Sequence, residues 1–370
     1  MNSTSIRRAV VPGIAALALL LSACGAGNEE TPSTDGGSSD AATGLSGDLA
    51  GGGATSQEKA QAAWRAGFQT ANPDVTINYD PVGSGTGREN FINEAYLFAG
   101  TDSPITDEEG ELTAAKERCG GSDVIQVPAY VSPIAVVFNL PGIDSLNLSA
   151  EVLTGIFDGS ITAWDDQAIV ADNPDADLPS SDIVPVHRSD DSGTTENFTK
   201  YLEAAGGWSF EPDGEWPSDI SGGEAAEGTS GVTGLVTDNE GYIAYADASA
   251  AGDLGVVSVK VGSDFNAPST DGAAKTLAIS PLTEGNAPTD MAFDIDRATT
   301  ESGAYPVILV SYLLACQTYP ADQAEVVKAY LEYVISPEGQ EAANAEAGSA
   351  PLDAGVQADA LAILEGITAQ

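Results

Sequence analysis

Three short segments rich in glycine, serine and threonine each stand directly before a stretch that is expected to form a helix. They are residues 51–56, 83–87 and 188–195, and the third opens with Arg188. The first N–H groups of a helix have no partner within it and lie at the positive end of its dipole. Any one segment could be an ordinary helix cap. Three together, one with an arginine, favour an anion-binding site, where glycine lets the main chain approach the ligand closely.

Other chemistries fit these segments less well. The pattern G-x-x-x-x-G-K-[ST] of a nucleotide-binding loop is absent from the sequence. Residues 56–59 read S-x-x-K, but the K-T-G motif that accompanies it in penicillin-recognising acylases is missing. The chain has a single histidine, His187, and the acidic run 172–177 lacks the spacing of a calcium loop. We therefore predict that the protein is not an enzyme and holds no metal and no cofactor.

The overall composition excludes further classes. The 370 residues include 13 Lys and Arg against 56 Asp and Glu, which gives a formal net charge of −43. Such a chain has no basic patch with which to neutralise the phosphates of a nucleic acid or to bind an anionic membrane surface. Hydrophobic residues make up 42% of the chain, which is typical of a packed globular protein, and the length allows two domains.

The N-terminus has the pattern of a targeting segment. Arg7 and Arg8 precede the apolar stretch 9–21, which ends in Leu-Ser-Ala before Cys24. This ending resembles a bacterial lipobox, and the resemblance implies cleavage after a signal peptide of residues 1–23 and lipidation of Cys24. The alternative is an ordinary secretory signal followed by an unrelated cysteine. Residues 24–47 have almost no large apolar side chain and are expected to form a flexible tether to the cell membrane, on its extracytoplasmic face.

Two cysteines remain after Cys24, namely Cys119 and Cys316. Thiols tend to pair in an oxidising compartment, so we predict a disulfide between them. Two isolated buried thiols are the alternative, because the sequence does not fix connectivity.

Apolar, β-branched stretches alternate along the chain with segments of helical periodicity. The predicted strands are 75–79, 124–127, 134–138, 183–186, 242–245, 256–261 and 307–314. Helices are expected around Trp64 and Phe68, Phe91, Phe198 and the stripe 326–334, and from Ser336 and Pro337 onward. Pro185 favours an edge strand, and residues 213–231 are expected to form a surface loop. The alternation predicts an α/β protein with largely parallel sheets.

Five stretches carry a resemblance to a known family. In chain order they read GGGAT (51–55), GSG (83–85), GTDSP (100–104), FDGSITAW (157–164) and RSDDSGT (188–194). With these stretches, the sequence from about residue 47 to 350 resembles the PstS family, the periplasmic phosphate-binding proteins of high-affinity phosphate ABC transporters, in its actinobacterial lipoprotein form. The last stretch is the most specific.

The resemblance implies a set of phosphate-binding residues. They are Thr55, Ser56, Ser84, Asp102, Arg188, Ser192, Gly193 and Thr194. In this assignment Thr55 and Ser84 contribute hydroxyl groups, Ser56 contributes its backbone N–H, and residues 192–194 donate from the start of the third helix. Arg188 supplies the guanidinium group, which Asp190 would hold in place.

Asp102 falls where the family has an acceptor carboxylate. Phosphate near neutral pH keeps at least one P–OH group, whereas sulfate has none, so a carboxylate gains a hydrogen bond from phosphate and repels sulfate. On local chemistry alone, Asp102 could also cap its own loop. Arg297 follows an acidic stretch, whereas Arg188 heads the Ser/Gly/Thr segment, and Arg297 is expected to lie outside the site.

The resemblance also implies the architecture, which is an α/β, two-lobed periplasmic-binding-protein fold of type 2 (a Venus flytrap) with two hinge crossings. We place the crossings near 127–132 and 305–310. Lobe 1 is then residues 48–130 and 308–370, and lobe 2 is residues 131–307.

The predicted function is a lipid-anchored, monomeric receptor that binds inorganic phosphate between its lobes and delivers it to the permease subunits of an ABC-type importer, with no nucleic-acid partner. Alternatives are a binder of another oxyanion, and a phosphate sensor or surface lipoprotein that is not coupled to transport.

Overall fold

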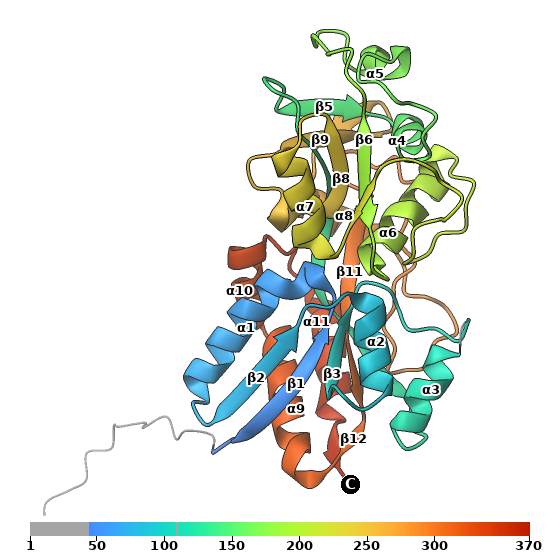
Figure 1. Ribbon diagram of the computed structural model, residues 1–370. Helices are drawn as coiled ribbons and strands as arrows, with labels where there is room; N and C mark the ends of the chain where they lie inside the picture. Colours follow the sequence, from blue (N-terminus) through green and yellow to red (C-terminus); the bar gives the residue numbers. More distant parts are fainter. Residues whose placement is uncertain (1–43, 109) are drawn as a thin grey trace, which may run out of the picture. The chain divides into compact units, whose positions relative to one another are not determined.

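The computed structural model of the protein describes residues 44–108 and 110–370 (Figure 1). The predicted signal peptide (1–23), the lipidation site Cys24 and most of the tether (24–47) lie outside the described residues. In the part of the chain that is described, no helix is long and apolar enough to cross a membrane.

Strands and helices alternate along the chain, as the sequence predicted. The strands are β1 (Gly47–Gly53), β2 (Val75–Asp80), β3 (Phe98–Thr101), β4 (Val124–Phe138), β5 (Ser145–Leu148), β6 (Val184–Arg188), β7 (Glu224–Ala226), β8 (Tyr242–Asp247), β9 (Gly255–Val261), β10 (Asp264–Asn266), β11 (Ile308–Cys316), β12 (Thr318–Tyr319) and β13 (Thr368–Ala369). The helices are α1 (Glu58–Ala71), α2 (Ser84–Ile92), α3 (Glu111–Arg118), α4 (Ala150–Phe157), α5 (Gln167–Asp172), α6 (Gly193–Tyr201), α7 (Gly228–Asp238), α8 (Thr270–Ile279), α9 (Ala321–Ile335), α10 (Pro337–Ala347) and α11 (Ala354–Glu365).

Eleven of the strands form one mixed sheet. Its main path runs β2-β1-β3-β11-β4-β8-β6-β7, and β9 joins β5 and β10 to β4. The pairs at the two ends of this path are parallel, whereas β11 and β4 in the middle run antiparallel to their neighbours. The prediction of largely parallel sheets therefore holds for the two ends of the sheet and is wrong for its middle.

The sheet passes through two lobes (Figure 1). The first lobe contains β1–β3 with α1–α3 and α9–α11, and the second contains β5–β10 with α4–α8. The strand β4 belongs to both, because it pairs with β11 up to Pro133 and with β8 from Ile134 onward. A single extended strand thus carries the chain from one lobe to the other.

The structure replaces the two predicted strands 124–127 and 134–138 by the one long strand β4. Proline lacks the N–H group that a sheet ladder needs, and two prolines lie between these segments. Pro128 lies opposite Tyr312, where the register between β4 and β11 shifts at a bulge, and Pro133 is the last β4 residue that pairs with β11. Both prolines thus lie where the ladder changes, so the strand continues through them.

The prediction of an edge strand at Pro185 is also wrong, because β6 lies between β8 and β7. Pro185 pairs with Ile243 of β8, and the pairing with β7 starts only at Val186. The missing N–H group of Pro185 therefore falls outside the short ladder with β7. The strand β7 and the start of α7 both lie within residues 213–231. The prediction of a surface loop over these residues is therefore only partly correct.

Local patterns explain the elements that were predicted well. Along β2, buried and exposed residues alternate from Val75 to Asp80, which places one face of the strand in the core. On α1, Trp64 and Phe68 lie one turn apart and are both buried, and the Phe68 ring packs edge-on against Tyr330 of α9 at a centroid distance of 5.4 Å. Ser336 caps α10 by accepting a hydrogen bond from the Gly339 N–H, and Pro337 occupies the first turn.

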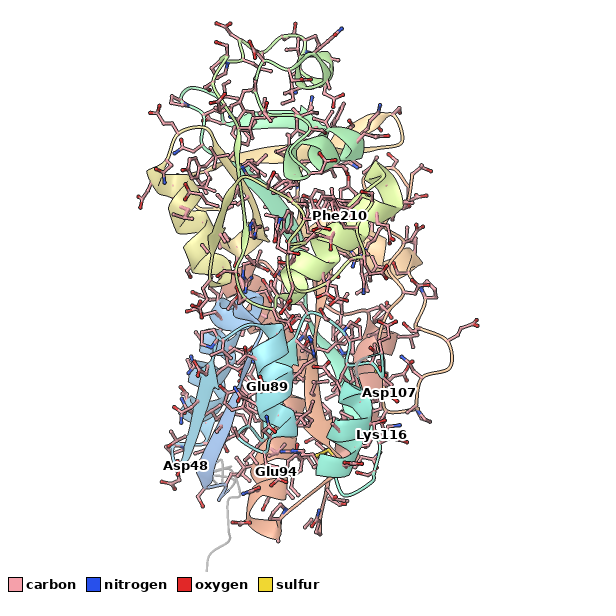
Figure 2. The ribbon with its side chains drawn as sticks, turned by 45° about the vertical axis from the view of Figure 1, so that its right-hand side comes forward. Asp48, Glu89, Glu94, Asp107, Lys116 and Phe210 are labelled. Atoms are coloured by element: carbon pink, nitrogen blue, oxygen red, sulfur yellow. A yellow bond between two sulfur atoms is a disulfide. The ribbon has the colours of Figure 1, made fainter. Side chains whose placement is uncertain are left out.

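The predicted disulfide is confirmed. Cys119 directly follows α3 and Cys316 ends β11, and the two residues are bonded with their Cα atoms 5.3 Å apart. The bond ties α3 to the sheet of the first lobe and is visible near Lys116 in Figure 2.

The large negative charge is carried by exposed side chains. Figure 2 shows Asp48, Glu89, Glu94 and Asp107 on the first lobe, and all four are exposed to solvent. Asp102 and Asp247 are different, because they are buried and accept hydrogen bonds from neighbouring side chains.

Candidate anion-binding site

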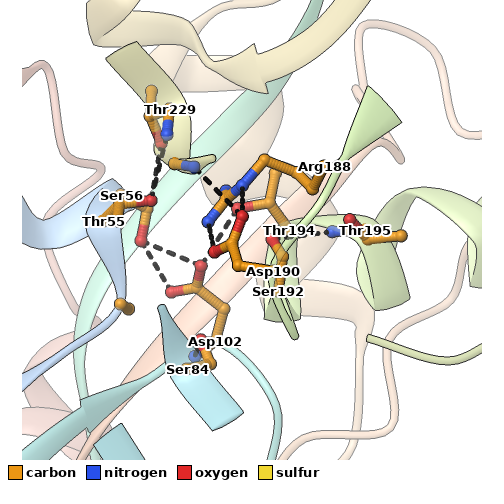
Figure 3. A network of polar contacts seen from close by, with 12 residues as sticks. Thr55, Ser56, Ser84, Asp102, Arg188, Asp190, Ser192, Thr194, Thr195 and Thr229 are labelled. Carbon is orange, nitrogen blue, oxygen red and sulfur yellow. Dashed lines mark hydrogen bonds and ion pairs between the residues drawn. The ribbon is translucent and has the colours of Figure 1, made fainter. Parts of the chain in front are cut away.

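Four helix starts and the end of one strand meet at the boundary between the lobes (Figure 3). From the first lobe come the short turn Thr55–Gln57 before α1, the first residue of α2, and Asp102, which follows β3. From the second lobe come the segment between β6 and α6, and the start of α7. The three segments singled out in the sequence are thus brought together, and a fourth helix start joins them.

Asp102 lies at the centre of this group and is 2% exposed. Ser56 Oγ donates to both carboxylate oxygens of Asp102, at 2.7 and 2.9 Å, and Thr194 Oγ1 donates to one of them at 3.2 Å from the second lobe. The backbone N–H of Asp102 donates to Ser84 Oγ at 3.1 Å. The carboxylate of Asp102 therefore accepts from hydroxyl groups on both lobes, and none of the hydrogen bonds found for it within the described residues comes from an N–H group of its own loop.

Burial raises the pKa of the Asp102 carboxyl group, and hydrogen bonds from the surrounding hydroxyl groups offset only part of that shift. No ion pair of Asp102 occurs among residues 44–108 and 110–370. A carboxyl group in this state is a better proton acceptor than an exposed aspartate.

Arg188 lies at the end of β6 and is 3% exposed. Its Nε donates to Asp190 Oδ1 at 2.7 Å, and its Nη2 donates to Asp190 Oδ2, so the two side chains form a bidentate ion pair. Asp190 Oδ1 also accepts from the backbone N–H of Gly228 at the start of α7, at 3.0 Å. Within the described residues, Arg188 Nη1 makes no hydrogen bond, so this edge of the guanidinium group is available to a ligand.

Asp190 has a pKa below its usual range. Burial alone would raise the pKa of Asp190, but the hydrogen bonds and charge of Arg188 outweigh that effect. The pair therefore stays ionised at neutral pH, and Asp190 fixes the plane of the guanidinium fork while cancelling much of its charge.

The start of α6 approaches Asp102 closely. Ser192 caps this helix by accepting from the Thr195 N–H at 3.3 Å, and its own hydroxyl hydrogen can still be donated elsewhere. A Cβ atom on Gly193 would lie 2.7 Å from the Asp102 Cβ, a contact that only glycine avoids. The residue type of Gly193 thus allows the two lobes to meet at this point.

The sequence did not identify the contribution of α7. Thr229 Oγ1 lies 2.9 Å from Thr55 Oγ1, and the Thr229 N–H donates to the same Thr55 oxygen at 3.3 Å. The stretch Gly-Thr-Ser-Gly at 228–231 has the same composition as the other three helix starts. That composition was the available signal, and the assignment of 213–231 to a surface loop obscured it.

Arg297, which was expected to lie outside the site, reaches it indirectly. It is buried, and its guanidinium group donates to the side-chain oxygen of Asn197 on α6. Asn197 in turn donates to the backbone oxygens of Asp102 and Gly193, both at 2.8 Å. Arg297 is therefore one residue removed from Asp102.

Further contacts join the lobes around this centre. Arg88 of α2 forms an ion pair with Asp191 at 3.4 Å and with Glu111 of α3 at 2.8 Å. The backbone N–H of Gly85 donates to the Asp191 carbonyl oxygen at 3.3 Å. The lobes are thus in direct contact, and the donors and the acceptor described above are enclosed between them.

Comparisons with known proteins agree with this architecture. The family model of the PBP superfamily domain matches residues 36–338. The phosphate-binding protein PstS2 of Mycobacterium bovis (strain BCG / Pasteur 1173P2) is 34% identical over 371 residues, which cover 97% of this chain and 98% of that protein. The phosphate-binding protein PstS of Methanocaldococcus jannaschii is 32% identical over 297 residues, 75% of each chain.

A solved structure shows the same fold. It is a high-affinity periplasmic phosphate-binding protein with bound phosphate, which superimposes with a TM-score of 0.69 over 85% of this chain and 93% of its own, at 24% identity. With near full-length identity of 34% to a curated relative, the chain belongs to the PstS family of phosphate-binding proteins.

Proposed function

We propose that this protein is an extracytoplasmic receptor that binds inorganic phosphate between its two lobes and delivers it to an ABC-type phosphate importer. The observation that carries the proposal is the centre formed by Asp102 and Arg188. It combines a buried carboxyl group of raised pKa with an oriented guanidinium group and several hydroxyl and N–H donors. Relatives of this chain carry the name phosphate-binding protein, which agrees with this chemistry.

The donors of the centre suit a tetrahedral oxyanion. In this proposal the anion is held by Thr55, Ser56, Ser84, Arg188, Ser192, Gly193 and Thr194. The Nη1 edge of Arg188 offers a charge-assisted hydrogen bond, which is stronger than a neutral one. The helix starts add N–H groups at the positive ends of their dipoles. Because Asp190 cancels much of the Arg188 charge, binding would depend on directed donors more than on net positive charge.

Asp102 supplies the selectivity. Phosphate offers at least one P–OH group to this carboxylate near neutral pH, whereas sulfate offers only unprotonated oxygens that a carboxylate repels. A site that is built to accept a hydrogen bond from a substrate hydroxyl can reject an analogue lacking it by roughly 10⁴-fold. The raised pKa of Asp102 strengthens it as the acceptor of that proton.

Binding would favour the closed arrangement of the lobes, because only that arrangement brings both sets of contacts to the anion. We propose that the hinges lie near 127–132 and 305–310, with residues 48–130 and 308–370 forming lobe 1 and residues 131–307 forming lobe 2. The change of partner along β4 between Pro133 and Ile134 supports the first position.

We further propose that the receptor is a monomer that is anchored to the outer face of the cell membrane through a lipid on Cys24. The sequence pattern before Cys24 supports this anchor. The receptor would then meet the permease subunits of the importer while it remains attached to the membrane by residues 24–47.

Calorimetric titration of the purified protein with phosphate, arsenate and sulfate tests the proposed function. We expect one saturable site for phosphate and no measurable heat from sulfate at the same concentrations. Absence of phosphate binding, or equal affinity for sulfate, would contradict the proposal.

A further inference from the structure

A buried arginine without an ion-pair partner lies next to the proposed phosphate site. Three arginines are buried in the described ranges 44–108 and 110–370, namely Arg88, Arg188 and Arg297. The first two form ion pairs with carboxylates, whereas none of the ion pairs found in these ranges includes Arg297. Burial lowers the pKa of Arg297 to about 10, so its guanidinium group is still charged at neutral pH. A buried charge without an ion-pair partner is costly, so the presence of a charged Arg297 at this position needs an explanation.

The contacts of Arg297 lead directly to Asp102. Its Nη1 donates to the backbone oxygen of Ile308 at 3.0 Å, and its Nη2 donates to Asn197 Oδ1. A guanidinium group has only donors, so the oxygen of the Asn197 amide must face it and the NH₂ group must face the other way. That NH₂ group donates to the backbone oxygens of Asp102 and Gly193, both at 2.8 Å. Arg297 therefore orients the amide that links the Asp102 peptide to the start of α6.

Arg297 also lies on a cavity that Asp102 borders. Arg297, Asn197 and Asp102 line this cavity of about 300 Å³ between the lobes, whereas the other residues proposed to hold the anion do not line it. The other titratable groups on this cavity are Lys200, Glu203, Asp294 and Tyr312. Glu196 of α6 and Asp294 act on Arg297 through space, but Glu196 is already paired with Lys200.

The charges of the proposed site do not balance once an anion is bound, and Arg297 can offset the excess negative charge. The Arg188–Asp190 pair is neutral, and Asp102 adds one negative charge before any anion enters. Phosphate then adds one or two more negative charges at a buried position, where charge interactions are weakly screened. Arg88 cannot offset them fully, because it is already shared between Glu111 and Asp191. Arg297, by contrast, forms no ion pair within the described residues, and Glu196 and Asp294 offset its charge only through space.

We propose that Arg297 is a positioning residue of the phosphate site, which holds the Asp102 peptide against α6 through Asn197 and compensates the charge of the bound anion. This inference rests on the proposed function. It makes a prediction that a purely structural role does not make: the contribution of Arg297 must grow with the charge of the anion. Phosphate is mainly a dianion at about pH 8 and mainly a monoanion at about pH 6, so the same ligand supplies both charges.

The test is calorimetric phosphate affinity at these two pH values for the parent protein, Arg297→Gln, Arg297→Lys and the control Arg65→Gln. Arg65 is a half-buried arginine on α1 whose Nε donates to the Gln61 backbone oxygen. For Arg297→Gln we expect an affinity loss of about tenfold at the higher pH and about threefold at the lower pH, because the charge interaction doubles with the dianion. Arg297→Lys should lose affinity but keep the pH dependence of the parent, and Arg65→Gln should match the parent.

A second variant covers the case in which Arg297→Gln does not fold. Asn197→Asp places a carboxylate of the same size against Arg297 and neutralises its charge in place, but it also removes the NH₂ donor to the Asp102 and Gly193 backbone oxygens. It should therefore lose affinity at both pH values, with the larger loss at the higher pH. Equal losses at both pH values, or parent-like affinity in Arg297→Gln and Asn197→Asp, would overturn this inference alone. A parent protein that binds no phosphate would overturn the proposed function and this inference with it.

Discussion

Two aspartates lie within the same site, Asp102 buried and Asp190 partly buried, and their surroundings set them apart. Asp102 is contacted by hydroxyl groups and has a raised pKa, because burial outweighs the hydrogen bonds that it accepts. Asp190 is contacted by the Arg188 guanidinium group and the Gly228 N–H, and its pKa is lowered despite burial. The chemical type of the partner thus decides the state of the carboxyl group.

This difference divides the work of the site. Asp190 is permanently charged and serves to orient Arg188, whereas Asp102 is a ready acceptor for a proton-bearing ligand. Neither role follows from the residue type alone. If the two aspartates do differ in this way, substitutions around them should have effects of different kinds as well as different sizes.

The largest loss of phosphate affinity is expected when the partner of Asp190, Arg188, is removed. Arg188→Ala removes the guanidinium fork and leaves Asp190 buried without its partner, which typically costs about 2–5 kcal/mol. Phosphate affinity, measured by calorimetry, should therefore fall by at least about 30-fold. The control is Arg65→Ala, which removes an arginine of α1 that contacts only its own helix among the hydrogen bonds described. Equal affinities in the two variants would remove Arg188 from the site.

A second fully buried carboxyl group extends the comparison to the stability of the protein. Asp247 at the end of β8 accepts hydrogen bonds from Tyr130 of β4 and the Ser249 N–H, and burial raises its pKa to about 6. A carboxyl group of raised pKa stabilises the fold fully below its unfolded pKa of about 4, and this contribution is lost as the pH rises through about 6. The difference between a pKa of about 4 in the unfolded chain and about 6 in the folded protein corresponds to about 3 kcal/mol.

Asp247→Asn should remove this loss, because the amide cannot ionise. Denaturant unfolding of the parent and the variant between about pH 4 and 7 checks the prediction. The difference between their free energies of unfolding should change by about 3 kcal/mol over this range. If the two stability curves run parallel, Asp247 is not the raised carboxyl group that its surroundings indicate.

Substitution of Asp102 is expected to change the selectivity for phosphate over sulfate. Asp102→Asn can turn its NH₂ group toward a bare oxyanion, so sulfate should compete at least about tenfold better against phosphate, equivalent to about 1.4 kcal/mol. Phosphate itself can still be held by the donors of Thr55, Ser84 and Arg188. Competition binding with excess sulfate measures the change, with Asp247→Asn as the control because it alters a buried carboxyl group outside the site. If sulfate competes no better against Asp102→Asn than against the parent, the proton-acceptor role is wrong.

The smallest effect is expected where the lobes meet beside the two aspartates. Thr229→Val keeps the shape of the side chain but removes the hydroxyl contact with Thr55, and a neutral hydrogen bond contributes about 0.5–1.5 kcal/mol. Phosphate affinity should fall by about two- to tenfold. Thr233→Val is the matched control, because Thr233 lies one turn later on α7 and donates to the Thr229 backbone oxygen within its own helix. An equal loss of affinity in both variants would show that the effect is not specific to the contact between the lobes.

The sequence predicted well what local pattern determines. The alternation in β2, the apolar side of α1 and the Ser336 cap are each encoded within a few residues, and the structure has them as expected. The three hydroxyl-rich helix starts were also found locally. Asp102 entered the predicted site through the family resemblance, since its contact with Ser56 joins residues that are 46 positions apart.

Contacts between distant segments could not be predicted from the sequence. Whether Pro185 lies at an edge depends on β7, a three-residue strand that has little sequence signal of its own. The environment of Arg297 depends on Asn197, which is 100 positions away. Such contacts are set by how the lobes pack, and no local periodicity reports on that packing.

A crystal structure of the protein grown with phosphate tests the central claim most directly. We predict one phosphate between the lobes, with one of its oxygens about 2.5–2.7 Å from a carboxylate oxygen of Asp102, as expected for an O–H donor and a charged acceptor, and with another on Arg188. A phosphate bound elsewhere, or bound here with Asp102 turned away from it, would contradict the account.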